Sequence, residues 1–296
     1  MEAVLNFLLL LSVTGGLFKN GHCSNEDVRL RIVEANQARL GQFPFMAYLV
    51  EDYRGTKTHL CGGTVISNNF ILTAAHCVIY HDGPTIPVSR LKVYLGSVYR
   101  ESGNIYNVQS TVAHPKYRLL KYHEDFSPSS EFDVALIKTT QPIEFSKEKV
   151  EPVFVAKSVV YLAGSSCVTP GWGGNKGIGT NPTRLLFGVT YPYQFSQCAK
   201  IYQAAGVKLN PNTHMCFFNP EKPKQQPCYG DSGGPVVCSR RGLPNMLYGI
   251  TTFGLYDDLC GVGTASVPFV YTNTAGPLYQ WIDTNCEKCL SRQPFN

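Results

Sequence analysis

The stretch Cys228-Tyr229-Gly230-Asp231-Ser232-Gly233-Gly234-Pro235 carries the strongest chemical signal in the chain. Its glycines allow a sharp turn and let another molecule approach the backbone, because they carry no side chain. A serine hydroxyl is a weak nucleophile at neutral pH unless a base removes its proton and a third group orients that base. Ser232 is therefore a candidate nucleophile, and the N–H groups of Gly230 and Ser232 are candidate oxyanion donors. The alternative is a glycine-rich turn with an incidental serine.

The candidate base is His76. Among the chain's seven histidines it alone lies in a run of small and apolar residues, Ile71-Leu72-Thr73-Ala74-Ala75-His76-Cys77. This run predicts a buried strand that ends in a tight turn. A lone histidine in such a setting is often a structural core residue. Here a disulfide between Cys77 and Cys61 would hold the turn in place, which favours a fixed functional imidazole.

The candidate orienting acid is Asp133, which opens the apolar run Asp133-Val134-Ala135-Leu136-Ile137. A carboxylate at the start of a buried strand is costly unless a donor satisfies it. An imidazole N–H is such a donor, so we expect Asp133 to lie against His76. The alternative is that Asp133 only caps the start of a strand.

Chain order separates the known arrangements of such residues. Enzymes of the α/β-hydrolase type carry G-x-S-x-G and place the histidine after the serine, but no histidine follows Ser232. A subtilisin-like order needs an acid before His76, and Asp27 and Asp52 lack a comparable setting. The order His76, Asp133, Ser232 is that of chymotrypsin-like enzymes.

On these motifs the chain resembles the trypsin/chymotrypsin family of serine proteases from about Ile32 to about Cys286. The resemblance implies an all-β fold of two packed antiparallel six-stranded Greek-key barrels with a C-terminal helix. It also implies a serine endopeptidase that works through an acyl-enzyme without a metal or organic cofactor. Besides the motifs quoted above, the matching stretches are Arg31-Ile32-Val33, Gly171-Trp172-Gly173, and Tyr271-Thr272 ahead of Trp281-Ile282.

We expect the protease domain to span residues 32–286, with barrels over about 32–140 and 157–272 and a helix over about 275–285. Trp281 and Ile282 of that helix are expected to pack on the second barrel, and 287–296 to form a polar tail. A short helix is expected between Gln194 and Gln203. The apolar runs that predict strands are 45–50, 59–66, 70–74, 91–95 and 133–138, then 166–172, 184–193, 214–218, 235–238, 246–254 and 269–272.

The N-terminus predicts secretion. An apolar core from Val4 to Leu11 is too short to span a bilayer and predicts a signal peptide over residues 1–23, cut between 16 and 23, although Glu2 replaces the usual basic start. An uncleaved anchor is the alternative. The net charge of +5 comes with no basic tract interleaved with aromatics, so we expect no nucleic-acid partner. No other apolar run is long enough to span a membrane, so we expect no membrane partner.

Eleven cysteines behind a signal peptide predict disulfides and an oxidising compartment. Three arrangements remain open for Cys23, Cys286 and Cys289: a Cys286–Cys289 loop, a bond from Cys23 to the tail, or a free thiol. A redox role for the last two is not expected, because nothing around them predicts a thioredoxin-like unit. The resemblance implies the pairs Cys61–Cys77, Cys167–Cys238, Cys198–Cys216 and Cys228–Cys260.

Residues 24–31 are polar and predict an exposed propeptide, with Arg31 as the site for an activating trypsin-like protease. By resemblance, the freed Ile32 amine would pair with the Asp231 carboxylate and order the loop that carries Gly230.

Residues 122–131 predict an insertion that overhangs the substrate cleft. Some relatives bind calcium where residues 96–107 lie, but Glu101 is the only carboxylate there, so we expect no metal site.

The resemblance also implies where the substrate pocket lies. Gln226 occupies a floor position where an aspartate would select Arg or Lys, and Phe269 stands where open-pocket members carry glycine. We therefore expect a shallow, uncharged pocket that prefers small or medium apolar side chains. Alternatively, the lengthened loop before Tyr271 moves Phe269 aside. The pocket residues implied are Gln226, Pro227, Thr252, Phe253, Gly254 and Phe269, and the Thr252 hydroxyl is also expected to reach Asp133.

The partners implied are protein or peptide substrates, the activating protease and protein protease inhibitors. A second function remains open because Phe269 would occlude the pocket. In that alternative the chain is a protease-like binding or regulatory protein with little or no turnover.

Overall fold

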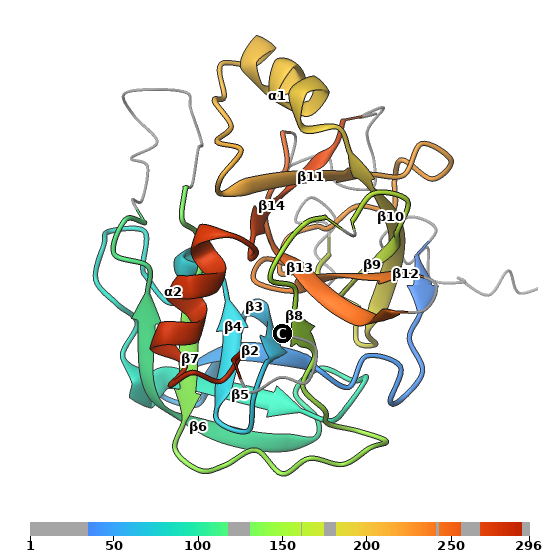
Figure 1. Cartoon of the computed structure of the whole chain (residues 1–296). Helices are drawn as coiled ribbons and strands as arrows, with labels where there is room; N and C mark the ends of the chain where they lie inside the picture. The colour runs from blue at the N-terminus through green and yellow to red at the C-terminus, as the bar shows by residue number, and fades with distance from the viewer. Residues whose placement is uncertain are drawn as a thin grey trace, which may run out of the picture.

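The computed structural model describes residues 35–117, 131–160, 162–174, 182–240, 243–255 and 267–291. Within these ranges two β-barrels lie against each other, and two α-helices lie on their outside (Figure 1). The predicted signal peptide, the propeptide with Arg31, Ile32, Cys260 and nearly all of 122–131 lie outside the described residues.

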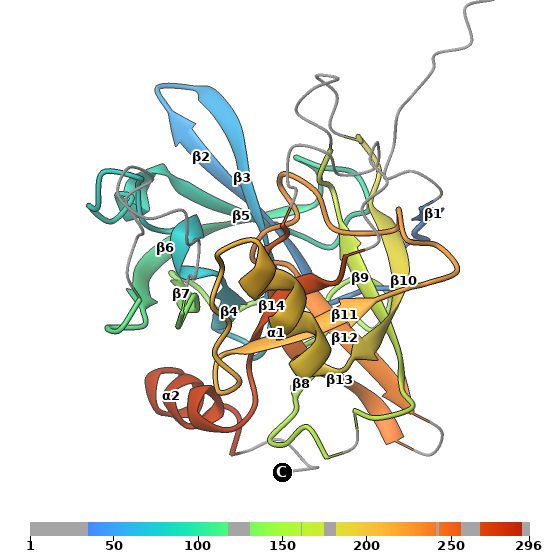
Figure 2. The same ribbon diagram turned by 90° about the horizontal axis from the view of Figure 1, so that it is seen from above.

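The first barrel closes in the strand order β2-β3-β4-β7-β6-β5, and every pairing in it is antiparallel. β6 was not predicted from the sequence, because only Tyr106 and Val108 of its ten residues are buried. Seen from above, the β2–β3 hairpin projects from this barrel (Figure 2). The strands are β2 (Met46–Tyr53), β3 (Thr56–Val65), β4 (Phe70–Thr73), β5 (Leu91–Leu95), β6 (Asn104–Ala113) and β7 (Ala135–Thr139).

The second barrel runs β10-β11-β14-β13-β12-β9, and a further antiparallel pairing of β9 with β10 closes it. β1 (Asn36–Gln37) adds to β10, and β8 (Phe154–Val155) pairs in parallel with β13. Two closed six-stranded antiparallel barrels confirm the predicted fold class. The strands are β9 (Ser166–Gly171), β10 (Leu186–Tyr193), β11 (His214–Phe218), β12 (Pro235–Arg240), β13 (Leu243–Phe253) and β14 (Phe269–Asn273).

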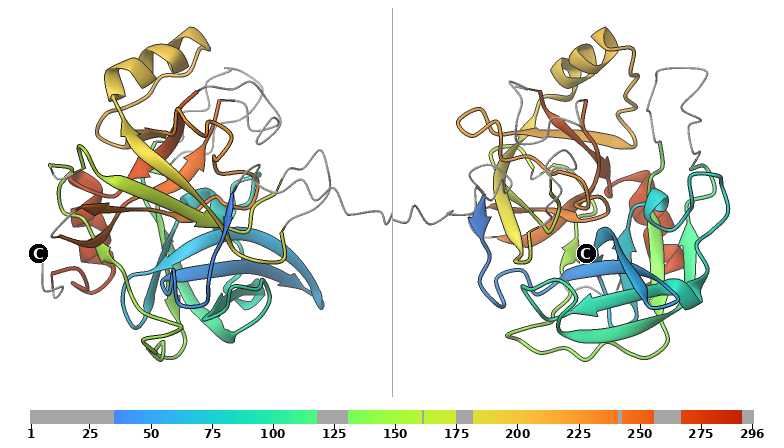
Figure 3. Two further views of the ribbon diagram at one scale, coloured as in Figure 1. Left: turned by 90° about the vertical axis from the view of Figure 1, so that its right-hand side faces the viewer. Right: turned by 180° about the vertical axis from the view of Figure 1, so that it is seen from behind.

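The helix α1 (Phe195–Ala204) covers the second barrel on the side away from the first (Figure 3). The disulfide Cys198–Cys216 joins it to β11. The disulfide Cys167–Cys238 joins β9 to β12 within the same barrel. Both pairs are those that the resemblance implied.

The expectation that Trp281 and Ile282 pack on the second barrel is wrong. α2 (Pro277–Asn285) lies beside the first-barrel strands (Figure 1). The Trp281 ring lies 4.9 Å from the ring of His114, which follows β6. The physical reason is the turn at Gly276, whose φ of 63° redirects the chain after β14. Leu278 and Ile282 of α2 are buried in the hydrophobic cluster that contains the core of the first barrel.

The chain beyond α2 folds back onto the helix as far as Ser291. Leu290 is fully buried, and the Asp283 carboxylate accepts the N–H groups of Leu290 and Ser291 at 2.9 and 3.0 Å. Cys286 and Cys289 are bonded to each other, which decides among the three arrangements that the sequence left open for them. A buried leucine in a mostly polar segment was the feature that sequence reasoning missed. No helix in the described ranges is long and apolar enough to cross a bilayer.

Candidate active site

His76 sits in a short 3₁₀ turn, Ala75–Cys77, directly after β4. The disulfide Cys61–Cys77 ties this turn to β3. The backbone N–H of His76 donates to Asp133 Oδ1 at 3.0 Å, and its ring Nδ1 lies 2.7 Å from Asp133 Oδ2. Cys61, His76 and Cys77 cluster closely, but sulfurs bonded to each other are not thiolate metal ligands.

Asp133 is fully buried at the entry to β7. The Thr252 hydroxyl, at the end of β13 in the second barrel, also donates to Asp133 Oδ2, as expected from the sequence. Burial raises the pKa of the Asp133 carboxyl, but the adjacent His76 and the donated hydrogen bonds outweigh burial and hold that pKa below its ordinary value. A carboxylate from the first barrel is thus held ionised by donors from both barrels.

Ser232 precedes β12 in a loop whose shape requires two glycines. Gly230 and Gly233 adopt φ values of 92° and 76°, which are accessible to glycine at little cost. The Gly62 N–H donates to the Ser232 carbonyl at 2.8 Å. A Cβ on Gly233 would lie 2.2 Å from Thr73 Oγ1, at the start of the His76 turn. These contacts bring the loop of Ser232 against the segment that carries His76.

The Ser232 hydroxyl forms no hydrogen bond within the described residues. A hydrogen bond between a catalytic hydroxyl and its base is commonly long or poorly aligned in a free enzyme, and it tightens when substrate is bound. Its backbone N–H and that of Gly230 also have no acceptor in the described part of the chain. Two neighbouring N–H groups in a partly buried glycine turn are suited to bind an anionic oxygen.

His59 is a neighbour of this loop that sequence reasoning did not single out. Its ring stacks on Tyr48 with centroids 4.4 Å apart, and a Cβ on Gly230 would lie 2.7 Å from its Cε1 atom. Burial, with a smaller contribution from Arg100, lowers the pKa of His59 to about 4. His59 is therefore neutral at pH 7 and forms a wall behind Gly230. Its place two residues before the disulfide-bonded Cys61 was the signal available in the sequence.

Asp231 points away from solvent and is 3 % exposed. It accepts the N–H groups of Gly173 at 2.6 Å and Cys228 at 2.8 Å. No lysine, arginine or histidine of the described residues pairs with it, and burial raises its pKa to about 6. A Cβ on Gly171 would lie 1.8 Å from its Oδ1, so Gly171-Trp172-Gly173 provides the space for this carboxylate.

The shifted pKa of Asp231 predicts how stability depends on pH while Arg31 is uncut. A folded-state pKa of about 6, above the ordinary 3.8, means that the folded chain holds this proton more tightly than the unfolded chain. The contribution is full below pH 3.8 and is lost as pH rises through 6, by at most about 3 kcal/mol. Chemical unfolding of the uncut chain and of Asp231→Asn at several pH values measures it.

In that comparison the free energy of unfolding of the wild type should fall relative to Asp231→Asn between about pH 4 and pH 7. Parallel curves for the two proteins would contradict the assignment. If cleavage after Arg31 frees an Ile32 amine that pairs with Asp231, the fall should vanish in the cut chain.

The pocket residues implied by the resemblance lie between β13 and β14 and beside the Ser232 loop. The Gln226 amide donates to the Val267 carbonyl at 2.7 Å, so it is tied to the segment that leads into β14. Phe269 is 7 % exposed, and its ring packs edge-on to Tyr271 with centroids 5.5 Å apart. Phe253 is equally buried against Tyr202. Pro227 is buried, whereas Gly254 is only partly so.

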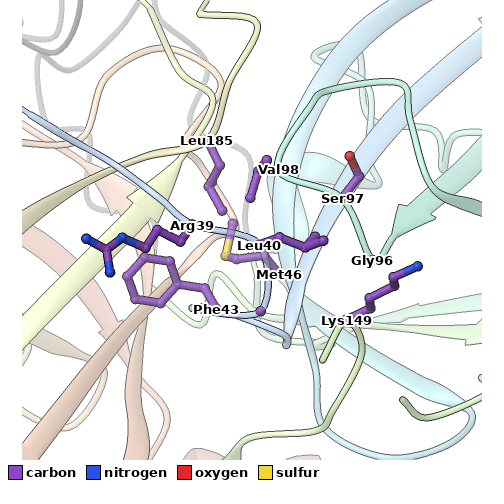
Figure 4. A pocket seen from close by; sticks show the side chains of 10 residues that line it. Arg39, Leu40, Phe43, Met46, Gly96, Ser97, Val98, Lys149 and Leu185 are labelled. Carbon is purple, nitrogen blue, oxygen red and sulfur yellow. The ribbon is translucent and has the colours of Figure 1, made fainter. Parts of the chain in front are cut away.

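A separate small pocket lies where the two barrels meet on another side (Figure 4). The side chains of Leu40, Met46, Val98 and Leu185 converge on it, with Arg39 and Lys149 at its edges. None of the residues that line it belongs to the candidate catalytic set, so it is not the candidate active site.

Comparisons with known proteins agree with this geometry. The family model for trypsin matches residues 32–282. The serine proteinase stubble of Drosophila melanogaster is 30% identical over 256 residues, which cover 82% of this chain and 29% of that protein. The chain thus spans less than a third of the length of this relative.

Proposed function

Because the chain belongs to the trypsin family of serine proteases, we propose that it is a serine endopeptidase with a His76–Asp133–Ser232 triad. Ser232 is the nucleophile, His76 the general base and then general acid, and Asp133 the carboxylate that orients the ring. The observation that carries this assignment is the 2.7 Å contact between His76 Nδ1 and the buried Asp133 carboxylate. With the Nδ1 proton donated to Asp133, Nε2 is the ring nitrogen that would accept a proton.

In the proposed reaction the Ser232 oxygen attacks the scissile carbonyl carbon while its proton moves to His76 Nε2. The carbonyl oxygen becomes an oxyanion that the N–H groups of Gly230 and Ser232 bind. Collapse breaks the C–N bond, and the imidazolium gives its proton to the leaving amine. Water then attacks the acyl-enzyme with the same base and restores the serine.

We propose that cleavage after Arg31 activates the chain. This proposal rests on the burial of the Asp231 carboxyl without a cationic partner among the described residues. A fully buried carboxyl with two N–H donors and no paired cation among the described residues would accept the freed Ile32 amine. The pair would hold Asp231 ionised and fix the neighbouring Gly230. We further propose that the predicted signal peptide directs secretion into an oxidising environment, in which the disulfides are stable.

The proposed specificity is for small or medium apolar side chains. The Phe269 ring is buried, and the Gln226 amide is bonded to a carbonyl, so neither of these two described pocket residues offers a negative charge to Arg or Lys. We expect a peptide library to be cut after Ala, Val or similar residues. Phe269→Gly should raise kcat/KM for Phe and Leu substrates by roughly 10-fold, because a buried ring is replaced by space.

A library profile led by Arg or Lys would contradict this specificity. An unchanged profile in Phe269→Gly would show that the ring lies outside the pocket. Phe145→Gly is the matched control, because Phe145 is 47 % exposed and lies in neither barrel strand nor pocket.

The proposed function is tested with a fluorogenic peptide library before and after cutting at Arg31. We expect turnover to appear only after cutting and to be lost in Ser232→Ala. A folded, correctly cut chain that hydrolyses no peptide would favour the alternative, a binding or regulatory protein with an occluded pocket. The burial of Phe269 at a position implied to line the pocket is the observation that favours this alternative.

A further inference from the structure

Phe132, directly before Asp133, has a backbone conformation that its residue type disfavours. Its φ is 59°, in the left-handed region. A bulky side chain is uncommon there, whereas Gly, Asn and Asp adopt that region more readily. Strained backbone of this kind persists only when surrounding contacts hold it, and it gathers at functional sites. The Phe132 ring is only partly buried, so filling the core does not account for it.

The contacts that hold Phe132 are aromatic. The ring of His114 stacks on the Phe132 ring with centroids 4.7 Å apart and planes 12° apart. The Trp281 ring of α2 also packs against the His114 ring, with centroids 4.9 Å apart. The Lys116 ammonium lies 5.4 Å from the centre of the Phe132 ring. Such ring pairs and cation–ring contacts add directional attraction to simple burial.

The same residues fix the backbone on both sides of Asp133. The Val134 N–H donates to the Phe132 carbonyl at 2.8 Å, which makes a three-residue turn with Asp133 at its centre. The His114 N–H donates to the Val134 carbonyl at 2.9 Å. His114 therefore contacts the turn at two points: its ring stacks on Phe132, before Asp133, and its N–H binds the Val134 carbonyl, after Asp133.

We propose that Phe132 is a positioning residue, whose ring, clamped by His114, holds the turn that aims the Asp133 carboxylate at His76. This inference rests on the proposed function, because it gives Asp133 the orienting role. Without the clamp, φ at residue 132 would relax to negative values and the carboxylate would turn away from Nδ1. A displacement of about 1 Å at such a group can cost roughly 100-fold in rate.

The test uses variants that separate the ring from the backbone conformation it maintains. Phe132→Tyr keeps the ring and should behave as the wild type. Phe132→Ala removes the ring and disfavours positive φ, whereas Phe132→Asn removes the ring but accepts positive φ. His114→Ala removes the clamp while leaving Phe132 in place. Phe145→Ala is the control for loss of a phenyl ring at an exposed site.

Two readouts are measured on the full chain. The first is the far-downfield proton NMR resonance of the His76–Asp133 hydrogen bond, identified by its loss in Asp133→Asn. The second is the division of kinetic effect between kcat and KM after cutting at Arg31. For Phe132→Ala and His114→Ala we expect the resonance to shift or broaden, and kcat to fall at least 10-fold with KM within twofold. Phe132→Asn should recover most of both losses.

Equal losses in Phe132→Ala and Phe132→Asn would mean that the ring only packs, and would overturn the inference. So would a wild-type resonance and kcat in folded Phe132→Ala or His114→Ala. The resonance is read without turnover, so it judges the positioning role by itself. A wild-type chain with the resonance but no hydrolysis would instead contradict the proposed function.

Discussion

Ser232→Ala is expected to lower kcat by about 10⁶-fold on any peptide that the wild type cuts. The reason is that no other group can form the acyl-enzyme once the hydroxyl is removed. A residual acceleration of roughly 10³ over water should remain, because the Gly230 and Ser232 backbone N–H groups and substrate binding survive the change. Initial rates on the best library peptide, with enzyme concentration fixed by absorbance, measure this.

The control for this variant is Ser239→Ala, because Ser239 lies in the adjacent strand β12 and is exposed to solvent. Its kcat should match the wild type. If Ser232→Ala retained more than a few per cent of activity after purification away from wild type, Ser232 would not be the nucleophile. Equal thermal unfolding of the two variants would show that the loss is chemical and not due to misfolding.

Asp133→Asn is expected to lower kcat by about 10⁴-fold, the size of effect seen for this change in the general triad. Three donors converge on the Asp133 oxygens: the His76 N–H, the His76 ring Nδ1–H and the Thr252 hydroxyl. An amide has one oxygen instead of two, so its NH₂ group would face one of these donors. When it faces Nδ1, the imidazole carries its proton on Nε2 and cannot accept the proton of Ser232.

Asp82→Asn is the matched control, because Asp82 is exposed at a turn after the His76 segment. It should leave kcat unchanged. Retention of kcat within tenfold in folded Asp133→Asn would contradict the orienting role. The buried site also predicts lower stability for Asp133→Asn, since an unmatched donor in the interior costs about 1–3 kcal/mol, and the unfolding curve measures this directly.

The fold was predictable where strands are apolar on the buried face and was missed where they are not. Runs such as Phe70–Thr73 and Leu91–Leu95 are buried along almost their whole length, so their continuous apolar character identifies them. Only two of the ten residues of β6 are buried and half are polar, and its pairing with β5 and β7 is a long-range property of the closed barrel. The placement of α2 was wrong because a helix pattern shows that a face is buried but not against which barrel.

The site was predictable from residue type but not in its supporting contacts. His76 and Asp133 stood out because a polar group in an apolar run needs a partner, and the structure joins them at 2.7 Å. His59 and Phe132 did not stand out. Their importance lies in a close approach to Gly230 and in a backbone angle, and neither is written in the local sequence.

The proposal that Ser232 is the activated nucleophile is tested most directly by reacting the Arg31-cut chain with a fluorophosphonate and mapping the adduct by peptide mass spectrometry. The account predicts one stoichiometric adduct, on the peptide that contains Ser232, and none in Ser232→Ala or before cutting. Absence of an adduct on the folded, cut protein, or an adduct on a different residue, would contradict it.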